Sequence, residues 1–271
     1  MYEFVDTIES SDGMISSGLP AEAMSINGIY IENEIEGYRT LQVTGREQQD
    51  SEIGDLQLGN MDGTKFLYKR NEPRDIKVTF RILSSSPEEF RSKFNQLNSI
   101  LDQDEAEIRF ADETDKFFVG TKNSGPEVDG GLLNVTGEFT IHCSDPFKHG
   151  EEVSVSIGTE DSKTVLVQGM RETPCVIEIT PPNGVISFTI KGAARDPVTG
   201  ETEDILIKNL SAGKTVVING EDDTVLEDGM NKFADTEMWE FPSLLPGENI
   251  LSFVSSSVPC DVTIKYKPRY I

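Results

Sequence analysis

The segment Arg74–Ile82 constrains the fold most strongly, because its residues alternate strictly between apolar and polar. The apolar positions are Ile76, Val78, Phe80 and Ile82. In a β-strand these four side chains lie on one face, and the polar residues between them lie on the other. Such a strand needs a core on one side and water on the other, which favours antiparallel sheets.

One convincing helix follows this strand. Ser86 is placed to cap its N-terminus, Pro87 suits the first helical position, and Glu89 completes a capping box. Apolar residues, two of them phenylalanines, then recur at helical spacing up to Leu101. We expect the helix at about 87–101, lying on a sheet, because such an apolar stripe requires burial.

The second half of the chain contains strand patterns without a helical pattern. Turn residues recur roughly every 8–12 residues, which is typical of a β-sandwich. The boundary follows an alternating strand that ends at Cys143, where Asp145-Pro146 interrupts the pattern. The sequence therefore predicts a mainly β protein with two domains, 1–149 and 150–271. The first is β-sandwich-like with one helix, and the second is a β-sandwich.

Residues 45–63 are polar and rich in glycine, and the segment is long for a plain connection between strands. We expect a projecting hairpin or arm, with Asp62-Gly63 in its turn. Long segments of this kind in a compact domain often carry function.

The charge balance restricts the possible partners. The chain has 48 acidic and 24 basic residues, for a net charge of −24. Such a surface repels a phosphate backbone and an anionic membrane, so we expect neither specific nucleic-acid binding nor membrane binding. The chain shows no basic stripe, no apolar run of about 18 residues and no signal-peptide pattern at its start.

The three cysteines, Cys143, Cys175 and Cys260, are far apart in the sequence. This spacing fits no metal or redox motif, so we expect buried, reduced thiols and folding in a reducing cytoplasm. The two histidines have no partner ligands at useful spacing, and His142 fits a half-buried strand position. We therefore expect no metal and no cofactor.

Neither catalytic nor nucleotide-binding motifs occur in the chain, which predicts a non-enzyme. Two alternatives stay open. One is a carbohydrate-binding module that uses the C-terminal sandwich, with Trp239, the only tryptophan, stacking on a sugar. Packing of Trp239 against the sandwich beside Met238 and Phe241 is the favoured interpretation of that residue. The other alternative is a hydrolase built on two of the 48 acidic residues.

The chain resembles the distal tail protein (Dit) family of long, flexible-tailed phages. Segments that match in order are Ile26-Asn27-Gly28, Val43-Thr44-Gly45-Arg46-Glu47, Asp62-Gly63-Thr64, Arg74–Phe80, the predicted helix, Ile108–Glu113 and Gly137–Phe147. In the second half, Phe241–Asn249 resembles the F-P-x-L-x-P-G-x-N segment of the family's galectin-like domain, and the terminal strand ends in Tyr266–Tyr270. The order and spacing of these segments carry the resemblance, and residues 1–22 have no counterpart in it.

The resemblance implies a structural virion protein at the tail tip. Members of this family form a hexameric ring from their N-terminal domains, with the galectin-like domains outside. The ring joins the tail tube and tape measure protein to the tail-associated protein (Tal, spike or lysin) and leaves a channel for DNA. In many phages it also anchors a receptor-binding protein.

The resemblance also suggests a task for the polar arm, which is to reach the neighbouring protomer and lock the ring. Candidate contact residues are Arg46, Glu47, Gln48, Gln49 and Asp50.

Overall fold

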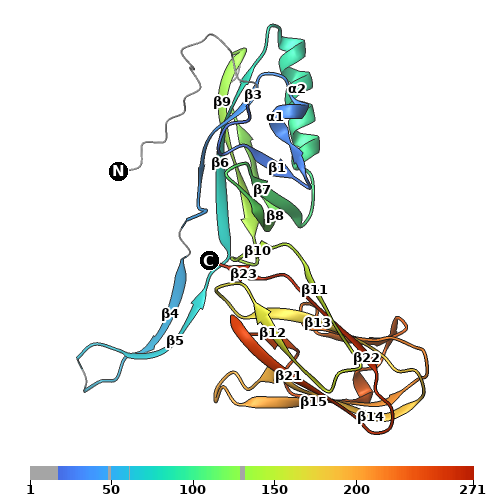
Figure 1. Cartoon of the computed structure of the whole chain (residues 1–271). Coiled ribbons are helices and arrows are strands. Elements are labelled where there is room, and N and C mark those ends of the chain that lie inside the picture. The colour runs from blue at the N-terminus through green and yellow to red at the C-terminus, as the bar shows by residue number, and fades with distance from the viewer. Residues whose placement is uncertain (1–17, 48–49, 61, 129–131) are drawn as a thin grey trace. The chain divides into compact units, whose positions relative to one another are not determined.

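The computed structural model describes residues 18–47, 50–60, 62–128 and 132–271, and it is mainly β, as predicted (Figure 1). The chain divides into two compact units. The N-terminal unit ends at Lys148, and the C-terminal unit comprises His149–Tyr270.

One antiparallel sheet forms most of the N-terminal unit (Figure 1). Its strands, in the order in which they pair, are β2 (Ile29–Tyr30), β1 (Met24–Ile26), β7 (Ala106–Phe110), β8 (Glu113–Glu127), β9 (Asn134–Cys143), β6 (Arg74–Leu83) and β3 (Tyr38–Thr44). The first part of β8 pairs with β7, and the part beyond Thr121 pairs with β9. Strand β8 therefore joins two halves of the sheet that share one core.

The predicted strand at 74–82 is β6, which lies between β3 and β9 and pairs with β9 along its whole length. Its four apolar side chains are fully buried, as the alternation predicts. The Phe80 ring packs between Tyr38 and Phe139, with ring centroids 5.4 and 5.7 Å away. Aromatic contacts of this kind add to the stability that burial of apolar area gives.

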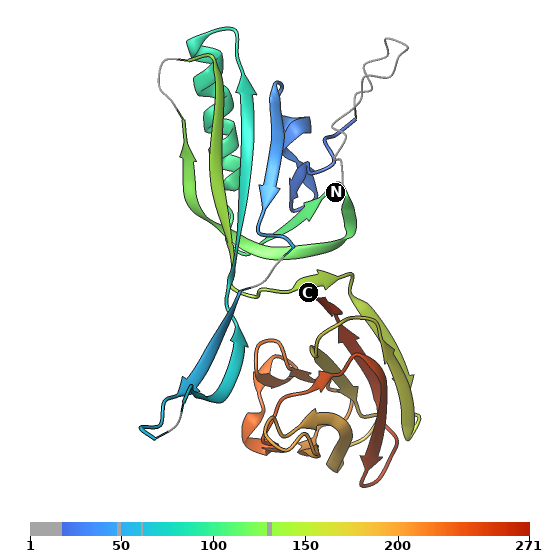
Figure 2. The same cartoon turned by 90° about the vertical axis from the view of Figure 1, so that its left-hand side faces the viewer.

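The predicted helix is α2 (Pro87–Leu101), which lies along the sheet in both views (Figures 1 and 2). The Ser86 hydroxyl accepts a hydrogen bond from the Glu89 N–H at 3.1 Å, which caps the helix as predicted. The Glu89 carboxylate accepts from the Ser85 N–H at 2.7 Å, one residue before the position that a capping box predicts.

The prediction of a single helix is incomplete, because the unit also contains the short α1 (Ile31–Glu34). Asn27 and Gly28, both with positive φ, form the tight turn between β1 and β2, a conformation that an Asn-Gly pair favours. The chain then turns into α1 instead of extending the strand. Its Ile31 side chain is fully buried, and the Glu32 carboxylate accepts from the Thr40 N–H at 2.9 Å.

The C-terminal unit is a β-sandwich with a single 3-10 turn, η1 (Phe233–Asp235), as its helical element. One sheet has the order β11 (Val153–Gly158), β22 (Asp261–Tyr266), β13 (Thr173–Thr180), β16 (Val216–Asn219), β17 (Thr224–Glu227) and β18 (Met230–Asn231), with β20 (Ser243–Leu244) beside β13. The other has the order β12 (Ser162–Val167), β21 (Gly247–Ser255), β14 (Val185–Arg195), β15 (Thr202–Leu210) and β19 (Thr236–Glu237).

Both sheets of the sandwich contribute to one core, with Ile177 and Ile264 from the first sheet and Ile190 and Ile205 from the second all fully buried. The short strands β10 (Lys148–Gly150) and β23 (Arg269–Tyr270) pair with each other, which ties the C-terminus of the chain to the start of this unit.

All three cysteines are free, and their side chains are buried, as predicted. Burial raises the pKa of Cys143 to about 12, and it also raises the pKa values of Cys175 and Cys260. A thiol held in the neutral form is a poor nucleophile, so these residues act as core side chains.

Candidate interaction surface

The arm is a separate two-stranded hairpin formed by β4 (Ser51–Leu56) and β5 (Lys65–Asn71) (Figure 2). Its register runs from Ser51 opposite Asn71 to Leu56 opposite Lys65. Among the described residues, neither strand pairs with any other strand. The sequence predicts an arm at 45–63, but the hairpin continues to Asn71 because the second strand carries residues with high β-propensity.

Apolar side chains of the hairpin are exposed to solvent. Those between 43 and 63% exposed are Ile53, Leu56, Leu58, Phe66, Leu67 and Tyr68. Single exposed apolar residues are common on protein surfaces, but six of them on one short hairpin indicate an interaction surface. A two-stranded hairpin is also marginally stable by itself in water, so a partner that covers it would stabilise it.

The local geometry of the hairpin holds the Tyr68 ring over Gly54. A side-chain carbon added to Gly54 would lie 2.2 Å from that ring, so a larger residue there would displace the ring. The register shifts directly after this pair, where Asp55 lies opposite Phe66 and Leu67 is the extra residue of a β-bulge. A bulge increases the local twist and re-aims the following side chains.

The charge of the hairpin differs from that of the rest of the chain. Three acidic and three basic residues balance between positions 51 and 71, namely Glu52, Asp55 and Asp62 against Lys65, Lys69 and Arg70. All three basic residues lie on β5, which has no acidic residue. Since the whole chain carries −24, the hairpin can approach an acidic surface that the remainder would repel.

Arg74 fixes the root of the hairpin. It opens β6, is 4% exposed, and donates hydrogen bonds to the carbonyls of Gly45 at 3.1 Å and Pro146 at 2.9 Å. A third hydrogen bond reaches the Arg46 carbonyl. The residues before β4 and the exit from β9 are thereby held by one guanidinium group, whose five donors in a fixed fork suit this task.

Gly45 is required at this root because its backbone has φ +92° and passes close to β6. A side-chain carbon at this position would lie 2.2 Å from the Asp75 carbonyl oxygen. Glycine alone adopts this conformation without strain or a clash.

Arg46 forms the second anchor. Its guanidinium donates two hydrogen bonds to the Asp112 carboxylate, at 2.9 and 3.1 Å, and stacks 4.1 Å from the centre of the Phe110 ring. The side chain is 7% exposed and Asp112 is 34% exposed. A bidentate pair of this geometry is among the strong ion pairs in proteins.

The five residues named as candidate contacts with a neighbouring protomer do not form one surface. Arg46 is buried within its own unit, whereas Glu47 and Asp50 are exposed. The Asp50 carbonyl accepts a hydrogen bond from the Glu72 N–H at 3.1 Å, which closes the base of the hairpin. Gln48 and Gln49 lie outside the described residues. The interprotomer role of this set stays a prediction.

Sequence reasoning missed the apolar residues of the hairpin. The run Phe66-Leu67-Tyr68, between lysines and directly after a turn signal, was the available indication of a strand. The sequence pattern does not predict that these three side chains are exposed, because the same apolar run would also suit a buried strand.

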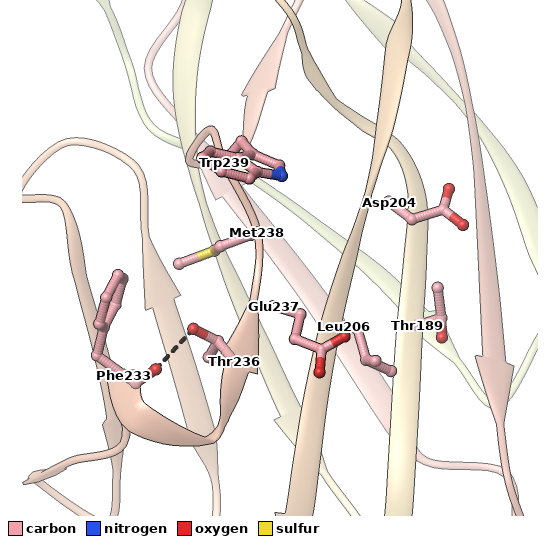
Figure 3. Close-up of a pocket in the computed structure, with 8 residues that line it drawn as sticks. All are labelled: Thr189, Asp204, Leu206, Phe233, Thr236, Glu237, Met238 and Trp239. Carbon is pink, nitrogen blue, oxygen red and sulfur yellow. Dashed lines mark hydrogen bonds between the residues drawn. The ribbon is translucent and has the colours of Figure 1, made fainter.

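The second predicted candidate, Trp239, does not pack against the sandwich. Its side chain is 90% exposed and stands beside a hollow in the C-terminal unit (Figure 3). Met238 and Phe241, its neighbours, are the ones that pack on the core. No group of potential metal ligands occurs among the residues that the structure describes, and in the same ranges no helix has the length and apolar character needed to cross a membrane.

Comparison with known proteins identifies the family. Residues 27–143 match the phage tail protein RIFT-related domain, and residues 168–270 match the C-terminal domain of the siphovirus-type tail component. The distal tail protein of Bacillus phage SPP1 is 29% identical over 122 residues, which make up 44% of this chain and 47% of that protein. The chain belongs to the siphophage Dit family. The alignment with this relative thus spans about half of the relative's length.

Solved structures agree with the Dit fold. The crystal structure of SPP1 Dit, described as a paradigm of the hub adsorption apparatus in phages that infect Gram-positive bacteria, has a TM-score of 0.75 at 16% identity. The similarity covers 92% of this chain and 99% of that one. A chain of the phage p2 baseplate in its activated conformation with Sr has a TM-score of 0.50 at 11% identity, covering 90 and 94%. Membership of the Dit family gives this chain a structural role in the phage tail.

Proposed function

We propose that six copies of this chain form a ring at the distal end of a siphophage tail. The ring joins the tail tube and tape measure protein on one side to the tail-associated protein on the other, and it supports a receptor-binding protein at its periphery. The proposal includes no catalytic role. The protein folds in the bacterial cytoplasm and ends in the virion.

The exposed apolar hairpin β4–β5 is the observation that carries this proposal. Its six apolar side chains need a cover that the described residues of the chain do not provide. A second copy of the same chain suits the surface, because the basic strand β5 complements a protein of net charge −24.

The anchoring of the hairpin supports the same conclusion. Arg74 and Arg46 fix the root of the hairpin to the sheet, so little conformational entropy is lost when the arm docks. An arm on one copy and its receiving surface on the next form a head-to-tail contact, and such contacts close into a ring when the rotation between copies permits.

The net charge suits a channel for DNA. Like charge opposes adhesion of the phosphate backbone during passage, which requires acidic residues along the inner wall of the ring. A ring whose inner wall is neutral or basic would contradict this part of the proposal.

The oligomeric state of the purified chain tests the proposal. We expect sedimentation velocity and mass photometry to give six times the chain mass of 30.0 kDa, with ring-shaped particles in negative stain. A mass of 30.0 kDa at every concentration up to about 100 μM would contradict a hub that assembles through its own arms, because that concentration corresponds to a contact weaker than about −5.5 kcal/mol.

A further inference from the structure

Trp239 stands at one end of a hollow of about 590 Å³ on the surface of the C-terminal unit (Figure 3). Phe233 and Met238 lie on the same side as the indole, and Thr189 and Asp204 lie on the opposite side. The volume falls in the range of roughly 300–1,000 Å³ that is usual for small-molecule sites. An indole that is 90% exposed next to such a hollow is available for stacking.

The floor of the hollow is the solvent-facing side of the second sheet. Thr189 on β14 lies opposite Leu206 on β15, which in turn lies opposite Glu237 on β19. The neighbouring Ile190 and Ile205 are fully buried. Because successive side chains of a strand point to opposite faces, the lining residues point away from the core.

Two carboxylates in the hollow are held in place by lysines. Asp204 forms an ion pair with Lys191 at 3.1 Å, and Glu237 forms one with Lys208. Each carboxylate retains capacity to accept further hydrogen bonds, because it offers about four acceptor sites. Since the lysines balance both charges, the hollow has no need for a cationic ligand.

The segment that carries Trp239 is fixed by a buried lysine. Lys232 donates to the Asn209 carbonyl at 2.9 Å and to the carboxylates of Glu227 and Asp235, each at 3.1 Å. The hydrogen bond from Lys232 lowers the pKa of Asp235. These contacts hold η1 and β19 on the sandwich, so the rim of the hollow is formed before any ligand arrives.

We propose that this hollow binds a neutral saccharide. The C–H groups on one face of a pyranose ring carry partial positive charge and match the negative face of the indole. The sugar hydroxyls donate to the carboxylates of Asp204 and Glu237. An anionic sugar is disfavoured by the net charge of −24. The inference does not depend on the hexameric ring.

Intrinsic fluorescence provides a direct test, because Trp239 is the only tryptophan of the chain. The full-length protein is titrated with lactose, maltose, cellobiose and chitobiose, and 3′-sialyllactose serves as the anionic counterpart of lactose. We expect a saturable blue shift of the emission with at least one neutral disaccharide, since a bound ring shields the indole from water. If lactose is the sugar that binds, its affinity should exceed that of 3′-sialyllactose.

Variants locate the binding, which is then measured by saturation-transfer NMR. Trp239→Ala removes the stacking face and should weaken binding roughly tenfold. Asp204→Ala removes one charged acceptor and should weaken it by a similar factor. The control Leu166→Ala changes an exposed residue on β12 of the same sheet and should leave affinity unchanged.

Two outcomes would overturn the inference. One is the absence of a saturable change with all four neutral disaccharides. The other is binding of equal strength in the native chain and Trp239→Ala. Because Trp239 is almost fully exposed, its replacement leaves the fold intact, which far-UV circular dichroism verifies.

Discussion

Replacing both Ile53 and Phe66 with aspartate is expected to convert the hexamer into monomers. The two side chains are 62 and 63% exposed in the single chain, so their replacement leaves its own core untouched. In the proposed assembly they lie beneath a neighbouring copy, where each apolar side chain contributes about 1.5–3 kcal/mol and a buried carboxylate costs more. Together the two substitutions weaken each contact between neighbouring copies by at least about 3 kcal/mol, which lowers its affinity roughly a hundredfold.

A matched control separates this effect from added charge. Ile186→Asp with Ile250→Asp introduces the same two charges at side chains that are 76 and 72% exposed in the C-terminal unit. Sedimentation velocity should show the hexamer in this control and monomers in the hairpin variant at the same concentration. Equal masses for the two variants would contradict a role of the hairpin in assembly.

Replacing Asp112 with alanine is expected to destabilise the N-terminal unit by about 3 kcal/mol. The substitution leaves the Arg46 guanidinium, 7% exposed, without its bidentate partner. Removing one member of a buried ion pair typically costs about 3–5 kcal/mol, and we expect the lower end because Asp112 is one-third exposed and Glu113 lies 3.9 Å from Arg46.

Hydrogen exchange measures this loss strand by strand. Protection of amides in β6 and β9 should fall by roughly a hundredfold, while β13 and β16 in the other unit remain unchanged. Glu138→Ala provides the control, since its ion pair with Lys77 spans 3.6 Å between half-exposed side chains of the same sheet. That variant should change stability by less than about 1 kcal/mol. If Asp112→Ala lowers amide protection no more than Glu138→Ala does, the ion pair of Arg46 does not anchor the root of the hairpin.

Local patterns predicted the regular elements well. The alternation at 74–82 and the cap at Ser86 act within a few residues, so the sequence shows them directly, and both appear in the structure. The short helix α1 was not predicted, because the turn into it after Tyr30 depends on burial of Ile31, a tertiary effect.

The candidate site was less predictable, because it depends on which strands have neighbours. Phe66 lies in a strand and Trp239 in the bend after β19, and only the three-dimensional fold leaves both side chains exposed. Arg46 illustrates the opposite case. It was predicted as a contact on the arm, but Asp112, 66 residues away in sequence, binds it within its own unit. Contacts of such sequence separation have no signature in a single sequence.

Cross-linking from position 66 tests the central claim, that a neighbouring copy covers the hairpin. The chain is produced with a photoreactive benzoylphenylalanine in place of Phe66, in ¹⁴N and ¹⁵N forms that are mixed before assembly. We predict abundant cross-links between light and heavy chains, from position 66 to the N-terminal unit of another copy. Cross-links confined to chains of one isotope would show that the hairpin folds back on its own chain and would contradict the account.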